Sequence, residues 1–117
     1  MNIYGNFPSV RMRRMRRDDF SRRLMQENVL TTNDLIYPVF VLDDRDVGKG
    51  KMQAVASMPG VKRMTTDKLL PVAEQCAKFG VPVIALFPVI DPKRKTPGVE
   101  EALNPRGLIP RAVAALK

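Results

Sequence analysis

The feature that most constrains the fold of this chain is an apolar run at residues 34–42, with the sequence DLIYPVFVL. Its β-branched and aromatic residues favour a strand over a helix. No polar residues alternate along it, so we expect a strand buried on both faces, as in the parallel sheets of α/β proteins. Pro38 cannot donate a ladder hydrogen bond, which predicts imperfect pairing or a bulge on one side.

A second run of the same kind follows at residues 81–90, and the residues between the two have a helical pattern. Possible N-caps at residues 65–67 precede the pattern, and Gly80 is placed to end it. Its apolar positions recur at helical spacing, at Leu69, Val72, Ala73, Cys76 and Ala77. Asn104 and Pro105 predict the start of another helix. The chain is therefore expected to contain two βα units, the strand–helix–strand order of α/β proteins.

The connection after the first strand, residues 43–53, carries both charges and two glycines and predicts a mobile surface loop. Further on, Pro59 and Gly60 fit the central positions of a type II turn. Carboxylates follow both strands, where βα barrels place their chemistry, although such acids more often cap turns. The basic run at residues 93–95 could bind an anion, but a solvated charge run is the more common case. The strand-end carboxylates are Asp43, Asp44 and Asp91.

Length and composition set further limits. At 117 residues the chain forms one domain at most, and two convincing strands are few for a closed parallel sheet. There is no histidine, and the single Cys76 is interpreted as a small core residue, which argues against a metal site built from this chain alone. No apolar run is long enough to span a membrane and no signal peptide is recognisable, so the default location is the cytoplasm.

Residues 1–30 predict an N-terminal arm with one short helix, which begins at Asp18 and ends near Asn28. Residues 31–117 then hold the two βα units. The net charge of +8 is unevenly placed along the chain, and seven arginines lie in this arm. Such an arm can dock on carboxylates of a partner subunit or bind nucleic acid, but nucleic-acid binding is disfavoured because only Phe20 is near for stacking. The seven arginines are Arg11, Arg13, Arg14, Arg16, Arg17, Arg22 and Arg23.

Residue chemistry alone gives a fold class and no reaction: there is no phosphate-binding glycine loop, nucleophile elbow or metal-spaced cluster. Five short segments, taken in their order along the chain, carry information about the protein family. They read RRDDFSRRL, DLIYPVFV, SMPGV, ALFPV and NPRGL. In this order they resemble the N-terminal part of the porphobilinogen synthase family, also called 5-aminolevulinate dehydratase, in wording closer to its bacterial members.

The resemblance implies the first part of a TIM (β/α)8 barrel, preceded by an arm that wraps a neighbouring subunit, usually in a homo-octamer. It also implies a lyase that condenses two 5-aminolevulinate molecules into porphobilinogen in tetrapyrrole (heme) biosynthesis. The segment covers roughly a third of such a protein, since the barrel alone needs about 250 residues. The family's two Schiff-base lysines and its metal ligands, for zinc or magnesium, match no residue here, so the isolated chain is predicted to be inactive.

Two sets of residues carry over from the family. Phe87 matches an aromatic residue that lines the substrate pocket, although a phenylalanine there is also a plausible core residue. The arginines of the arm and Phe20 match the region used for subunit contact. The alternative function is a non-catalytic basic interaction module, which binds a subunit or nucleic acid.

Overall fold

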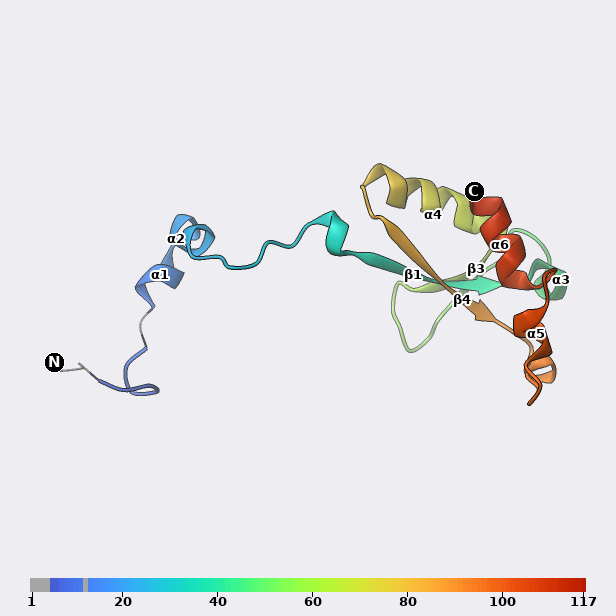
Figure 1. The fold of residues 1–117 in the computed structure, drawn as a ribbon, viewed down its shortest axis with the longest axis horizontal. Coiled ribbons are helices and arrows are strands. Elements are labelled where there is room, and N and C mark those ends of the chain that lie inside the picture. The colour runs from blue at the N-terminus through green and yellow to red at the C-terminus, as the bar shows by residue number, and fades with distance from the viewer. Residues whose placement is uncertain (1–4, 12) are drawn as a thin grey trace. The chain divides into compact units, whose positions relative to one another are not determined.

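The computed structural model describes residues 5–11 and 13–117. By its contacts the chain divides into two compact units, Met1–Leu30 and Thr31–Lys117. Figure 1 shows the course of the chain. No helix in the described part of the chain is long and apolar enough to cross a membrane.

The first unit contains two short helices, α1 (Arg14–Arg17) and α2 (Asp19–Leu24). The helix predicted from Asp18 is confirmed as α2, since Asp18 is its N-cap, but α2 ends at Leu24 rather than near Asn28. Ion pairs from Asp19 to arginines at the i+3 and i+4 positions stabilise it locally. The helix α1 was not expected from the sequence, because a run of arginines gives no apolar periodicity.

The second unit is a mixed α/β structure with a four-stranded sheet in the order β2-β3-β1-β4. Both β3 and β4 run parallel to β1, while β2 is antiparallel to β3. Two strands were expected and are present as β1 and β4; the other two are short and polar, which hides them from a search for apolar runs. The strands are β1 (Ile36–Leu42), β2 (Met52–Ala54), β3 (Lys62–Thr65) and β4 (Val83–Val89).

Two helices, α4 (Thr66–Lys78) and α6 (Leu108–Leu116), lie together on one face of this sheet (Figure 1). The core forms where they meet β1 and β3. Its buried members are Val39, Val41, Met64, Leu69, Leu108 and Ala112. The expected helix is therefore confirmed. Leu69 and Cys76 of its predicted apolar stripe are buried and Val72 and Ala73 are half-buried, but Ala77 is exposed.

The prediction that the first strand is buried on both faces is confirmed only for its carboxyl-terminal half. Val39 and Val41 face the helices and are buried, and Leu42 on the opposite face is buried too, whereas Ile36 is 64% exposed. On the face away from α4 and α6, Ile36 lies beside Val83 in the sheet register, and neither side chain is covered. Pro38 lies before the first residue of β1 that pairs with β3, so β1 has a partner on only one side at this position, as the imperfect pairing predicted from the proline requires.

Two turn predictions are confirmed by backbone geometry. Val61 N donates to Met58 O at 3.0 Å, and Gly60 has φ +85°, as a type II turn with Pro59 and Gly60 at its centre requires. After α4, Gly80 has φ +75°, the left-handed conformation that commonly ends a helix.

Two other predictions are wrong. The connection expected as a mobile loop at residues 43–53 contains helix α3 (Asp44–Val47) and leads into β2. Asn104 does not begin a helix: it ends the short helix α5 (Glu100–Leu103), and its Oδ1 accepts a hydrogen bond from Arg106 N at 3.0 Å. Asparagine favours local turns of this kind, and the next helix, α6, begins only at Leu108.

Candidate functional site

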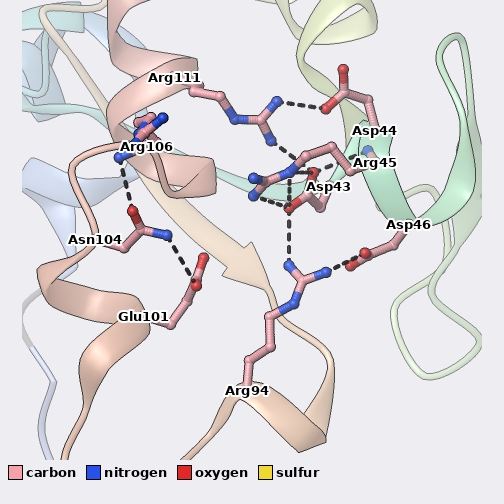
Figure 2. A network of polar contacts seen from close by, with 9 residues as sticks. All are labelled: Asp43, Asp44, Arg45, Asp46, Arg94, Glu101, Asn104, Arg106 and Arg111. Carbon is pink, nitrogen blue, oxygen red and sulfur yellow. Dashed lines mark hydrogen bonds and ion pairs between the residues drawn. The ribbon is translucent and has the colours of Figure 1, made fainter.

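The main polar cluster of the second unit lies at the carboxyl end of β1, on Asp43. This residue follows the last residue of β1 and is only 2% exposed. Three arginines from different segments converge on its carboxylate, as Figure 2 shows. We refer to Asp43, Asp44, Arg45, Asp46, Arg94 and Arg111 as the ion cluster.

Both oxygens of the Asp43 carboxylate are saturated by arginine donors. Arg45 Nη2 donates to Oδ2 at 2.8 Å and Arg45 Nε to Oδ1 at 3.1 Å, a forked arrangement. Arg94 Nη1 donates to Oδ2 at 3.1 Å, and Arg111 Nη2 donates to Oδ1 at 2.7 Å. The backbone N–H of Arg45 also donates to Oδ1, so Asp43 is the N-cap of α3.

Two outer carboxylates of the cluster each accept a further guanidinium donor. Arg111 Nη1 donates to Asp44 Oδ1 at 2.9 Å, and Arg94 Nη2 donates to Asp46 Oδ1. Arg94 belongs to the 3-10 helix η2 (Pro92–Arg94), which follows β4, and Arg111 belongs to α6. The cluster therefore ties together the segment after β1, the segment after β4 and a helix of the core layer.

The electrostatics of the cluster exclude proton transfer by Asp43 near neutral pH. Hydrogen bonds from the Arg45 side chain lower the pKa of Asp43 far below its ordinary value, and further bonds from the Arg45 backbone, Arg111 and Arg94 outweigh the opposing effect of burial. The pKa values of Arg45 and Arg94 are raised, chiefly by their bonds to Asp43. Asp43 is thus ionised near neutral pH.

The other expected strand-end residues have local roles. Asp91 accepts a hydrogen bond from Lys93 N at 2.9 Å and caps η2, the turn-capping role left open from the sequence. Within the basic run at residues 93–95, Arg94 is directed into the ion cluster, so the run does not present all three cations to an anion. A hollow of about 290 Å³ lies between the ends of β1 and β4, with Asp43, Asp46 and Asp91 in its wall.

These carboxylates do not suit a metal ion. No group of three or more His, Cys, Asp or Glu side chains in the described ranges could hold one. Asp43, Asp44 and Asp46 are already paired with arginines. We therefore assign no metal ligand to these residues.

Phe87 lies on β4, on the sheet face away from α4 and α6. Its ring is tilted against that of Phe40, its neighbour on β1, with 5.9 Å between the ring centroids. The residue is 50% exposed. It is not a member of the ion cluster, and its position leaves one side of the ring open to a ligand.

The predicted contact residues of the arm lie at its surface. Phe20 is 66% exposed, and the Arg11 guanidinium lies 5.4 Å from the centre of the Phe7 ring. Arg22 donates to the carbonyl oxygens of Arg16 and Arg17. Arg13, Arg14 and Arg23 are also exposed, although Arg23 pairs with Asp19 at 2.8 Å.

Sequence reasoning missed the convergence of Arg45 and Arg111 on Asp43. One signal was present: Arg111 is the only charged residue of α6, whose other members are apolar apart from its proline. A lone charge in such a helix needs a partner when it packs against a core. The identity of that partner depends on the sheet register and could not be read from the chain.

A mixed sheet in which β3, β1 and β4 run parallel, with helices on one face and charged groups at the carboxyl ends of its strands, places the second unit in the α/β class of proteins. Within this class, the family model described as Delta-aminolevulinic acid dehydratase matches residues 9–117, and the chain belongs to that family.

Curated relatives agree with this assignment. The delta-aminolevulinic acid dehydratase of Bradyrhizobium diazoefficiens is 44% identical over 109 residues, which are 93% of this chain and 30% of that protein. The corresponding protein of Synechocystis is 38% identical over 111 residues, or 95% of this chain and 32% of the relative. The resemblance to this family, and to its bacterial members, is thereby confirmed.

A solved structure agrees as well. The delta-aminolevulinic acid dehydratase (porphobilinogen synthase) of Toxoplasma gondii, in complex with the reaction product porphobilinogen, matches with a TM-score of 0.77 and 38% identity. The match covers 92% of this chain and 29% of that structure. The chain thus spans roughly a third of the length of the relatives it matches.

Proposed function

We propose that this chain supplies the arm and the first βα units of a porphobilinogen synthase, a cytoplasmic lyase that condenses two 5-aminolevulinate molecules into porphobilinogen. The observation that carries this proposal is the match of residues 9–117 to the family, together with a fold that superimposes on a structure bound to porphobilinogen. In the complete enzyme the sheet would continue into a (β/α)8 barrel, with its reaction at the carboxyl ends of the strands.

In this proposal the described residues contribute binding and shape. Phe87 offers an exposed ring near the carboxyl end of β4, where an apolar wall can orient a small substrate and exclude water from it. Asp43 stays ionised and paired, so it holds structure and transfers no proton. The Schiff-base lysines and the divalent metal, zinc or magnesium, which the family implies, would be provided by other segments of the enzyme.

The arm has a separate role in the proposal. Its exposed arginines and Phe20 would contact a neighbouring subunit in a homo-oligomer, an octamer by analogy with the family. Guanidinium groups form forked bonds with carboxylates, so an acidic surface on the neighbour is the partner they fit best.

A chimeric enzyme tests the function. Residues 9–117 of this chain replace the matching segment of the Bradyrhizobium diazoefficiens enzyme, and porphobilinogen formation from 5-aminolevulinate is measured. The matched control carries the corresponding segment of the Synechocystis protein in the same host. We expect both chimeras to retain activity within about tenfold of the parent enzyme. An active control beside an inactive but folded test chimera would overturn the proposal.

A further inference from the structure

We propose that Asp43 is a positioning residue for the substrate site: it holds the segment after β4 in place at the edge of the sheet that carries Phe87. This inference rests on the proposed function. It adds a role for the ion cluster, whose carboxylates are paired with arginines.

The ion cluster is connected to Phe87 through the segment that follows β4. Phe87 is on β4, and the chain continues directly from that strand into η2, where Arg94 lies. The segment after β4 is exposed over most of its length, and Arg94 is its only residue in a salt bridge to another element. The position of this segment relative to β1 therefore depends on Arg94 and on the acids that it meets.

The charges of the ion cluster make the position of Arg94 sensitive to Asp43. Three guanidinium groups converge on one carboxylate whose side chain is 1% exposed, while the arginine side chains are 33% to 46% exposed. Asp43 is the anion that all three share, whereas Asp44 pairs with Arg111 and Asp46 with Arg94, so the repulsion among the three arginines rises when the charge of Asp43 is lost. A neutral side chain of the same shape would leave like charges facing each other, and the most accessible relief is for Arg94 to swing outward.

The hydrophobic core lies in a different place from Arg94, so a role in positioning can be distinguished from a role in overall stability. The buried residues of the sheet and helices, such as Val41 and Leu69, lie in the layer between β1, α4 and α6. That layer does not contain Arg94. Loss of the Asp43 charge is therefore expected to move the segment after β4 more than it loosens the core.

The first test measures motion and needs no activity. In the chimera, Asp43→Asn is compared with Glu74→Gln, an exposed acid of α4 that loses the same charge. Amide hydrogen exchange is followed in peptides that cover residues 90–96 and α4. We expect Asp43→Asn to speed exchange at residues 90–96 by about tenfold or more, and by a larger factor than in α4, whose amides report the loss of overall stability. Equal exchange in both variants would overturn the inference.

The second test measures catalysis in the same variants. We expect Asp43→Asn to raise the KM for 5-aminolevulinate by about tenfold with a smaller change in kcat, and Asp43→Glu to recover part of the loss. A variant that keeps the parent KM and kcat while its melting temperature falls would show a structural role only. If Asp43→Asn does not fold, Arg94→Gln removes a single partner and is expected to show both effects in weaker form; a parent-like Arg94→Gln would contradict us.

These tests separate the two proposals. An inactive unsubstituted chimera counts against the proposed function and leaves the exchange experiment to decide the role of Asp43. An active chimera with unaltered exchange and unaltered KM in Asp43→Asn counts against the positioning role alone.

Discussion

Arg111 Nη2 donates to Asp43 Oδ1 at 2.7 Å, although 68 residues separate the two in the chain. The bond joins α6 to the carboxyl end of β1, directly beside the buried layer that contains Leu108 and Ala112. A long-range contact of this kind fixes which helix packs over which strand end. The ion cluster is thus part of how the second unit specifies its topology.

The stability of the chimera is expected to depend on pH through Asp43. The arginines hold the pKa of Asp43 below its ordinary value of 3.8 in the folded state, so its contribution is fully present above about pH 5 and is lost as the pH falls below 3.8 toward the folded pKa. Asp43→Asn should lower the free energy of unfolding by about 2 kcal/mol at pH 7, because its partners are partly exposed. Denaturant unfolding at pH 7 and pH 3 measures this.

The control for that experiment is Glu74→Gln, which removes an exposed charge. The difference between parent and Asp43→Asn should shrink at pH 3, whereas Glu74→Gln should resemble the parent at both pH values. A difference that stays constant with pH would show that the Asp43 carboxylate has the same pKa folded and unfolded.

Leu69 and Leu70 form a matched pair on α4. Leu69 is fully buried in the core, and Leu70 is 37% exposed. Leu69→Ala should destabilise the fold by about 2 to 5 kcal/mol through lost burial and a cavity, and Leu70→Ala by about 1 kcal/mol or less. Thermal unfolding of the two variants in the chimera measures the difference, and similar melting temperatures would contradict the core described above.

Phe87 should affect substrate binding more than stability. Its ring is half exposed and packs on one side against Phe40, so Phe87→Ala is expected to cost about 1 kcal/mol of folding free energy. In the chimera the same change should raise the KM for 5-aminolevulinate about tenfold. Phe79→Ala, at a 72% exposed position after α4, serves as the control. If both variants have the parent KM, Phe87 does not line the substrate pocket.

The arginine arm should affect assembly. Replacing Arg16 and Arg17 by glutamine in the chimera is expected to shift the oligomer toward smaller species in sedimentation velocity. A higher salt concentration should dissociate this variant further, because screening weakens the ion pairs that remain. Lys93→Gln with Lys95→Gln removes the same charge from the exposed segment after β4. An unchanged oligomer in the arm variant, or equal shifts in both, would argue against the proposed subunit contact.

The long apolar elements could be predicted from the sequence because their signals are local. Uninterrupted apolar runs located β1 and β4, apolar residues at helical spacing located α4, and the Pro59–Gly60 pair located a turn. The short strand β3 escaped prediction, since its place in the sheet comes from parallel pairing with β1 and not from its own composition. Asn104 was misread because an N-cap and an asparagine turn share the same side-chain chemistry.

The site was harder to predict than the fold. Asp43 and Arg94 could each be noticed as polar residues after a strand, but their pairing requires β1 and β4 to be neighbours in parallel register. Arg111 depends further on the position of α6 over the sheet. Such contacts combine three elements that are distant in the chain, and no periodicity encodes them.

The most direct measurement of the central claim is porphobilinogen formation by the chimera that carries residues 9–117 of this chain. We predict product from 5-aminolevulinate at a rate within about tenfold of the Bradyrhizobium diazoefficiens parent, as for the Synechocystis control. A folded, assembled chimera that forms no porphobilinogen while the control does would contradict the claim that this segment serves a porphobilinogen synthase.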